Sequence, residues 1–387
     1  MRYSLRLRQR PYLRVLALFL VWWIIVQGFA MLAFNRFRLT QPDTAYSWTA
    51  RPSNSFLVQW HDFAEIHARW DSGFYAWIAR DGYTADTAAF FPLYPILIRG
   101  VSLLWPLFGQ PEPDYIGLIP AAFIVSNLAA LGAALALYKL ARLDMSEVEA
   151  QRGLFYFLIF PTAFFLTANY TESLFILWAT MSFYFARQGR WMWAGLVGAL
   201  AMLTRATGAA LFVGLALEWW AQRHTSRWRG LWLLLMPLAF AVFVWYLRQT
   251  QGLSFFDTQL RMFGRMPVNL SALLPGLDWA HVQVDAAAQA NLELDLGIGV
   301  LVLIGSLIVA RRWRWSYGIF GVLCIVLPLI SGSTVSLNRY ALAAFPVPLL
   351  IARYGNRPNI LSEAYVLSAT LLLAFYTALF VQGYWAG

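Results

Sequence analysis

Apolar runs of roughly 20 residues recur along the whole chain, from residues 14–34 near its start to residues 361–382 near its end. A helix needs about 20 apolar residues to cross the hydrocarbon core of a bilayer, so these runs predict that lipid is the main solvent of the chain. The composition agrees, because 60% of the residues are hydrophobic and only 12% are charged. These features exclude a soluble enzyme and a disordered protein, and the single cysteine, Cys324, excludes an internal disulfide.

Eleven apolar runs are candidate membrane spans, and they predict an all-α integral membrane protein. They cover residues 14–34, 115–138, 153–168, 172–186, 191–204, 207–221, 230–247, 296–310, 316–333, 340–352 and 361–382. The first run follows the basic segment MRYSLRLRQR and is too long and too rich in tryptophan for a secretory signal. We therefore expect an uncleaved first helix with the N-terminus in the cytoplasm.

Segment 90–109 decides the topology, because counting it as a span inverts every later loop. If it does not cross, 18 of the 29 basic residues lie on the cytoplasmic side, as the positive-inside rule requires. Arg99 and three prolines in this segment also favour an amphipathic helix in the membrane interface. We therefore expect a multi-pass protein of the cytoplasmic membrane, with its C-terminus outside.

Two long loops then face outward, residues 35–114 and 249–294, in a single membrane-embedded unit that covers residues 1–387. Both are too long to be simple connections. The outer side also holds 14 of the 19 acidic residues, so chemistry that uses carboxylates should lie there. The formal charge of +10 comes mainly from arginines scattered between apolar runs, a pattern that does not favour nucleic acid as a partner.

The densest polar cluster is WHDFAEIHARWDSGFYAWIARDGY, residues 60–83. Aromatic and aliphatic residues recur in it at three- and four-residue spacing, which predicts a helix at the membrane surface with interfacial carboxylates. Asp71, held by Arg69 or Arg80, could accept a proton from a hydroxyl group. The alternative is a solvated interfacial loop that its tryptophans anchor.

Four residues of this cluster, His61, Asp62, Glu65 and His67, have side chains that bind metals. Their spacing does not supply three or four convergent ligands, and no HExxH motif is present. We therefore expect no metal site here.

Three further charged residues fall at the outer membrane boundary: Glu172 in NYTESLF, Arg205 in LTRATG and Arg339 in STVSLNRY. A carboxylate at that depth needs a partner or a hydrated cavity, and Arg205 could be that partner. Guanidinium groups suit phosphate oxygens, so the two arginines could clamp a phosphate. Snorkelling to lipid headgroups explains them equally well.

The segments HARWDSGFY, ARDGY and FFPLYP resemble the PIG-V-type mannosyltransferases, a family of the C-type integral membrane glycosyltransferases, in a chain of bacterial appearance. The resemblance continues through YTESLF, RATG and LNRY, so its pieces follow in order over about residues 69–340. Thr207 stands where the family's R-x-N-G pattern has asparagine.

This resemblance implies an inverting transfer of mannose or a related sugar from a polyprenyl-phosphate donor to an outward-facing acceptor, with a glycolipid as the first candidate. It implies Asp71 as the general base, while Arg205 and Arg339 are our candidates for the donor phosphate. The implied substrate-binding residues are Arg69, Trp70, Tyr75, Arg80, Asp81, Tyr94, Glu172 and Tyr340. We expect no cofactor and no metal, because a monophosphate donor leaves little charge to neutralise.

A transporter or flippase of lipid-linked sugars explains the spans and the boundary arginines equally well. It does not explain why the WD motif, Trp70 and Asp71, lies in a long loop, because transport sites lie near the membrane midplane. A ligase with a lipid-diphosphate donor also remains open at this stage.

Overall fold

The computed structural model describes residues 11–36, 60–108, 117–223, 227–265, 286–332, 336–355, 360–384 and 386. In this part of the chain all regular secondary structure is helical. The prediction of an all-α membrane protein is confirmed.

Five helices in the described ranges are long and apolar enough to cross a membrane. They are α2 (Pro11–Arg36), α6 (Leu118–Ala141), the segment Arg229–Gln251, which continues from a 3-10 turn into α12 (Leu235–Gln251), α15 (Ala286–Arg312) and α19 (Ile360–Val381). Shorter helices pack beside them: α8 (Glu172–Arg187), α9 (Trp191–Met202), α10 (Gly208–Ala221) and α16 (Trp315–Ile330). The protein is therefore multi-pass, while the predicted count of eleven spans is not confirmed.

Two of the predicted spans are broken by turns. Run 153–168 contains the end of α7 (Glu147–Leu158), a turn at Pro161 and a 3-10 segment (Ala163–Leu166). Run 340–352 is divided between α17 (Leu337–Leu342) and α18 (Pro346–Tyr354). Proline accounts for both breaks, because it lacks a backbone N–H and clashes with the preceding helical turn.

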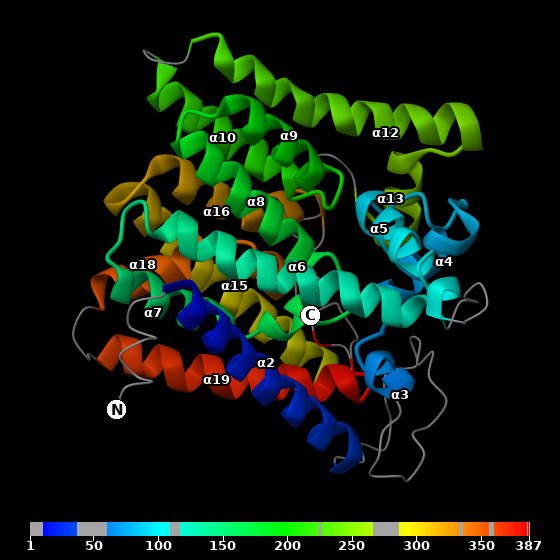
Figure 1. Ribbon diagram of the computed structural model, residues 1–387, viewed down its shortest axis with the longest axis horizontal. Helices are drawn as coiled ribbons and strands as arrows, with labels where there is room; N and C mark the ends of the chain where they lie inside the picture. Colours follow the sequence, from blue (N-terminus) through cyan, green and yellow to red (C-terminus); the bar gives the residue numbers. More distant parts are fainter. Residues whose placement is uncertain are drawn as a thin grey trace.

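The short helices of the two long loops, residues 35–114 and 249–294, gather at one end of the molecule, on the right in Figure 1. They are α3 (Trp60–Glu65), α4 (Asp71–Asp81), α5 (Leu93–Ser102) and α13 (Phe255–Phe263). Helices α7 and α18 lie at the opposite end. Helix α5 has 10 residues and is about 15 Å long, half of what a crossing needs. This length agrees with the prediction that segment 90–109 does not span.

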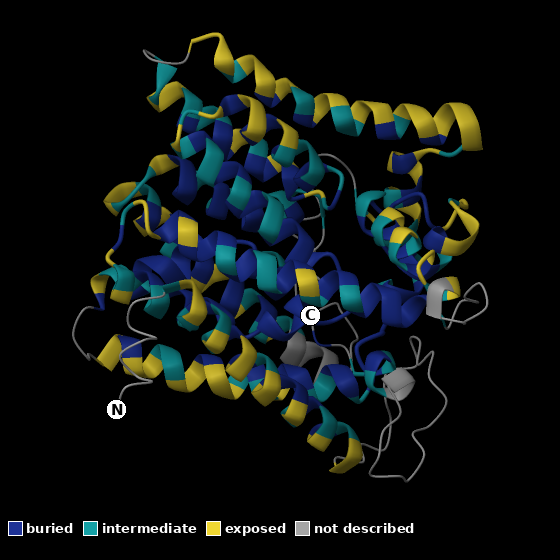
Figure 2. Ribbon diagram, viewed as in Figure 1, coloured by how far each residue is buried: buried dark blue, intermediate teal, exposed yellow. Residues whose placement is uncertain are grey.

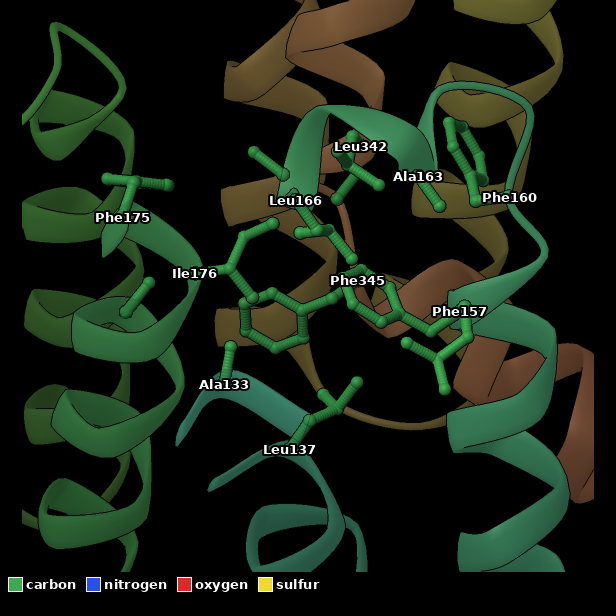
Figure 3. Close-up of a cluster of buried hydrophobic side chains, with 14 of the residues drawn as sticks. Ala133, Leu137, Phe157, Phe160, Ala163, Leu166, Phe175, Ile176, Leu342 and Phe345 are labelled. Atoms are coloured by element: carbon green, nitrogen blue, oxygen red, sulfur yellow. The ribbon is translucent and has the colours of Figure 1, made fainter. Parts of the chain in front are cut away.

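The outer helices have long exposed faces, and the inner helices are covered by protein. Figure 2 shows long exposed faces on α12 and α19. In α6, by contrast, 67% of the residues in its most apolar 18-residue stretch are buried. Inside the bundle, Leu166 from the break after α7 and Phe345 from the break after α17 lie in one apolar cluster with Phe157 and Ile176 (Figure 3). The two broken segments are thus held against each other, which fixes the chain next to Glu172 and Arg339.

A cluster of charged side chains lies at the C-terminal end of α8, the end opposite to Glu172. Arg187, the last residue of α8, contacts Asp144 at 2.6 and 2.7 Å. Glu218, which is 1% exposed, accepts from Arg314 at 2.9 Å and from Ser316 at 2.6 Å. Because α8 has 16 residues, about 24 Å separate this cluster from Glu172 at the other end of the helix. These ion pairs tie four segments of the bundle together on the side away from the two long loops.

Candidate active site

A cavity of about 360 Å³ lies where the two long loops meet the bundle, a size typical of small-molecule sites. Its lining residues come from α4, the segment before α5, the turns before α8 and α10, α13 and α17. They are Asp71, Tyr75, Ala89, Phe90, Phe91, Thr171, Thr204, Arg205, Ala206, Gln259, Met262, Phe263, Arg265, Ser336, Arg339 and Tyr340.

Two carboxylates stand at helix N-termini beside this cavity. Asp71 is the first residue of α4, and Glu172 is the first residue of α8. The free backbone N–H groups and the dipole of a helix start favour negative charge. Glu172 is 2% exposed, whereas the Asp71 side chain is 22% exposed. Asp71 is therefore the carboxylate that a substrate in the cavity can reach.

Arg339 connects the two carboxylates. Its Nε donates to Glu172 Oε1 at 3.0 Å, and both Nη atoms donate to Asp71 Oδ2 at 3.3 Å. Arg205 forms an ion pair with the same Glu172 oxygen. The arrangement Asp71–Arg339–Glu172–Arg205 holds the accessible carboxylate in a fixed position on the cavity wall.

Aromatic rings support the arginines. The guanidinium of Arg339 lies 4.6 Å from the ring centre of Tyr170 and 4.9 Å from that of Phe165. Arg205 lies 5.4 Å from the ring of Tyr340. Stacking on a ring face stabilises a guanidinium while leaving its edge free for oxygen acceptors.

The backbone is strained at the starts of two site helices. In the described residues, Trp70 (φ 44°) and Ser336 (φ 65°) are the two non-glycine positions with positive φ. Trp70 immediately precedes Asp71, and Ser336 is the N-cap of the helix that carries Arg339. Such conformations cost about 1–3 kcal/mol each and cluster at functional sites.

The structure brings together six of the residues predicted from the sequence. Asp71, Tyr75, Arg205, Arg339 and Tyr340 line the cavity, and Glu172 contacts two of them. Burial raises the pKa of the Tyr75 phenol above its ordinary value, and the charge of Asp71 raises it further. Tyr75 therefore keeps its proton and presents a hydroxyl donor.

The other five predicted residues lie away from the cavity. Arg69 is buried and donates to the backbone carbonyls of Glu65, Ala68 and Val381. The contact with Asp71 that the sequence predicted for Arg69 or Arg80 is made by Arg339. Trp70 packs against Phe380. The remaining three are Arg80 and Asp81, which form an exposed pair with each other at 3.1 Å, and Tyr94, which is buried and bonds Ser126 and Ala122.

No group of three or more His, Cys, Asp or Glu residues gathers within the described residues. The side chains of His61 and Asp62 lie outside the described part. His67 is buried, with its ring nitrogens 2.9 Å from Phe63 O and 2.5 Å from Gln27 Oε1. Burial lowers its pKa from 6.5 to about 4, so this imidazole is neutral and anchors the first loop to α2.

The sequence did not identify Arg265, which reaches the cavity from the second long loop. Its Nη1 donates to the hydroxyl of Tyr340 at 2.8 Å. The sequence does carry a helix-capping pattern before this residue: Ser254 caps the N-terminus of α13, and Gly264 ends the helix one residue before Arg265. That pattern locates the helix but does not show which loop it packs against.

A second, apolar groove of about 570 Å³ adjoins the cavity. Its walls are α4, α5 and α12, with Pro92, Leu203 and Phe243 among the lining residues and Arg99 as its charged member. Phe91 and Thr204 line the cavity, whereas their neighbours Pro92 and Leu203 line the groove. The two spaces therefore share one wall, where Leu93 N donates to Leu203 O at 3.0 Å.

Among solved structures, the chain is weakly similar to the oligosaccharyltransferase of Archaeoglobus fulgidus. The apo form of that protein aligns with 13% identity and a TM-score of 0.43, covering 94% of this chain and 56% of that one. Its complex with an inhibitory peptide and a dolichol-phosphate aligns with 16% identity and a TM-score of 0.38, covering 95% and 56%.

Closer sequence similarity is found to the mammalian proteins named GPI alpha-1,6-mannosyltransferase 2. Those of Rattus norvegicus and Mus musculus are 33% identical over 144 residues, which is 36% of this chain and 29% of each relative. The match thus covers less than a third of those relatives' length. Residues 12–221 match the family model described as Mannosyltransferase (PIG-V), a range that includes Asp71, Glu172 and Arg205. Because this match extends over more than half of the chain, the protein belongs to the PIG-V mannosyltransferase family.

Proposed function

We propose that the protein transfers mannose, or a related sugar, from a polyprenyl-phosphate donor to a hydroxyl group of an outward-facing acceptor. The single observation that carries this proposal is an accessible carboxylate, Asp71, fixed on a cavity wall by Arg339. Family membership supports the transfer of mannose. The name of the mammalian relatives, GPI alpha-1,6-mannosyltransferase 2, makes a glycolipid the first candidate acceptor.

The proposed step is an inverting displacement at the sugar carbon that bears the phosphate. The acceptor oxygen attacks from the face opposite the phosphate, and its proton moves to the carboxylate of Asp71. A new bond forms between the acceptor oxygen and the sugar carbon, while the bond from that carbon to the phosphate oxygen breaks. The leaving phosphate gains a negative charge, which the cavity arginines stabilise without having to reorganise. We propose that this step needs no metal ion, and loss of activity in a chelator would contradict that.

Helices of both outward loops line the cavity, so we propose that the site faces the outside, with the N-terminus in the cytoplasm. Nucleotide sugars are cytosolic, and an outward site therefore calls for a donor carried across the membrane on a lipid. The apolar groove beside the cavity would accept the chain of such a donor, with its phosphate at the shared wall. Polar cavity and apolar groove thus match the two parts of one amphiphilic substrate.

The test compares sugar transfer by wild type, Asp71→Asn and Asp81→Asn in liposomes with synthetic polyprenyl-phosphate mannose and a panel of lipid acceptors. Asn keeps the size of Asp71 and removes the proton acceptor, so we expect transfer to fall by about 10²–10⁴-fold. Asp81 is on the same helix but 56% exposed and paired with Arg80, so its variant should transfer at the wild-type rate. A folded Asp71→Asn protein with wild-type activity would contradict the mechanism, and wild type inactive with every acceptor would contradict the donor.

A further inference from the structure

Arg265 differs from the other cavity arginines in having no carboxylate partner among the described residues. In the described part of the chain, three arginines line the cavity. Arg205 and Arg339 both contact Glu172, and Arg339 also contacts Asp71. Arg265 instead contacts aromatic side chains: its guanidinium lies 5.4 Å from the ring of Phe263 and 5.6 Å from that of Tyr340. Its Nε is buried and has no hydrogen-bond partner in the part of the chain that the structure describes.

A half-buried cation with an unpaired N–H is unfavourable unless an acceptor completes the site. The planar donor fork of a guanidinium suits a phosphate, which can accept two parallel hydrogen bonds. Arg205 lies against the same Tyr340 ring at 5.4 Å, so two guanidinium groups converge at this side chain. The wall around Tyr340 is therefore built to receive an anion.

We infer that Arg265, assisted by Arg205, binds the phosphate of the lipid-borne donor, and that Arg339 instead holds the carboxylates Asp71 and Glu172. This assignment rests on the proposed function, and it changes which arginines carry the donor. It also makes the second outward loop part of the donor site.

The position of α13 explains how that loop delivers Arg265. Thr258 Oγ1 donates to Ala85 O at 3.1 Å and Gln259 Nε2 donates to Ala89 O at 2.8 Å, so α13 is docked on the first outward loop. Gly264 then ends the helix with φ 61°, a left-handed conformation that glycine adopts without strain. This turn places the next residue, Arg265, on the cavity wall.

The charge of the site identifies the class of phosphate. Among the described residues, the charged side chains that line the cavity, with the ion-pair partner Glu172, are three arginines and two carboxylates, which leaves a charge of +1. A sugar phosphodiester carries one negative charge and makes the site neutral. When the acceptor proton moves to Asp71 the side chains carry +2, and the leaving phosphate monoester is then close to a dianion. Neutrality is kept throughout for a monophosphate donor, whereas a diphosphate brings an extra negative charge at every stage.

The test measures binding, so it does not depend on sugar transfer. Wild type, Arg265→Gln, Arg265→Lys and Arg248→Gln are placed in zwitterionic nanodiscs and titrated with polyprenyl phosphate, polyprenol and phosphatidic acid. Arg248 is an exposed arginine at the end of α12 and controls for general attraction of anions to the surface. Charge-assisted hydrogen bonds predict about tenfold to a hundredfold weaker polyprenyl phosphate binding for Arg265→Gln. Arg265→Lys should lose less, because it keeps the charge but not the fork.

Wild-type affinity in Arg265→Gln and Arg265→Lys would overturn the inference, while leaving the proposed donor intact. Equal losses for Arg265→Gln and Arg248→Gln would also overturn it, since the effect would then be one of surface charge. If only phosphatidic acid binding depends on Arg265, the site recognises ordinary lipid headgroups and the assignment to the donor is wrong. If polyprenyl phosphate and polyprenol bind wild type equally well, the phosphate is not recognised and the proposed donor itself fails.

Discussion

Replacing Glu172 by Gln separates the stability of the site from its affinity for phosphate. Glu172 is 2% exposed, and one of its oxygens contacts both Arg205 and Arg339. Gln has the same size but no charge, so two buried guanidinium groups lose their shared counter-ion. Breaking a buried ion pair on one side typically costs about 3–5 kcal/mol. We therefore expect the variant to unfold at lower denaturant concentration by an amount in this range.

Phosphate binding should change in the opposite direction. Without Glu172 the charge of the site rises from +1 to +2, which favours an anion in the cavity. We expect polyprenyl phosphate to bind roughly tenfold more tightly, corresponding to about 1.4 kcal/mol of added attraction. Sugar transfer should still slow, because Arg339 loses the contact that fixes its position against Asp71.

The assay is unfolding in mixed micelles followed by tryptophan fluorescence, combined with the lipid titration in nanodiscs. Glu363→Gln is the matched control, because Glu363 is exposed near the start of α19. Unchanged stability in Glu172→Gln would refute the view that this carboxylate carries the network. Weaker phosphate binding with normal folding would refute the charge argument.

Three further outcomes follow from other parts of the molecule. Arg187→Gln leaves Asp144 and Glu218 with fewer partners, so unfolding in micelles should show a loss of about 3–5 kcal/mol, while polyprenyl phosphate affinity stays at the wild-type value. Ala239→Trp fills the apolar groove, so sugar transfer should slow with long-chain donors and change little with a donor on a short isoprenoid phosphate. An equal loss of transfer with both donors would place the lipid chain elsewhere. The folded pKa of His67, about 4, lies below its ordinary value of 6.5. The unfolded chain therefore binds a proton that the folded state excludes, stability should fall by about 2 kcal/mol on going from pH 8 to pH 5, and His67→Gln should abolish this contribution.

Much of the fold could be predicted from apolar periodicity. The long apolar helices, the short helix α5 within segment 90–109 and the helix that starts at Asp71 are all found in the structure. The breaks after α7 and α17 were missed, although Pro161 and Pro346 mark them, because hydropathy alone does not distinguish a continuous helix from two apolar pieces joined by a buried turn. Such turns are tolerated here because their apolar side chains pack into the same core (Figure 3).

The candidate site could be predicted less completely, because it depends on contacts between distant segments. Charge at the membrane boundary indicated Glu172, Arg205 and Arg339, since an ionised side chain at that depth requires a partner. The sequence assigned Arg69 or Arg80 to Asp71 because both are close to it in the chain. The structure pairs Asp71 with Arg339, 268 residues away, and turns Arg69 toward backbone carbonyls. Arg265 was missed because its position depends on how one loop docks on the other.

Backbone strain links this geometry to the sequence. A glycine at position 70 or 336 would adopt positive φ at little cost, yet the chain has tryptophan and serine there. Trp70 is 5% exposed and its ring lies 5.4 Å from that of Phe380, so packing against α19 holds the strained residue in place. The preceding residue, Arg69, is fixed to Val381 of the same helix at 3.1 Å. Because α19 thus fixes the residues on which α4 begins, the direction in which Asp71 enters the cavity is set by a helix that contributes no residue to its lining. The aromatic residue of the WD pair is therefore best understood as positioning the aspartate rather than as touching the substrate.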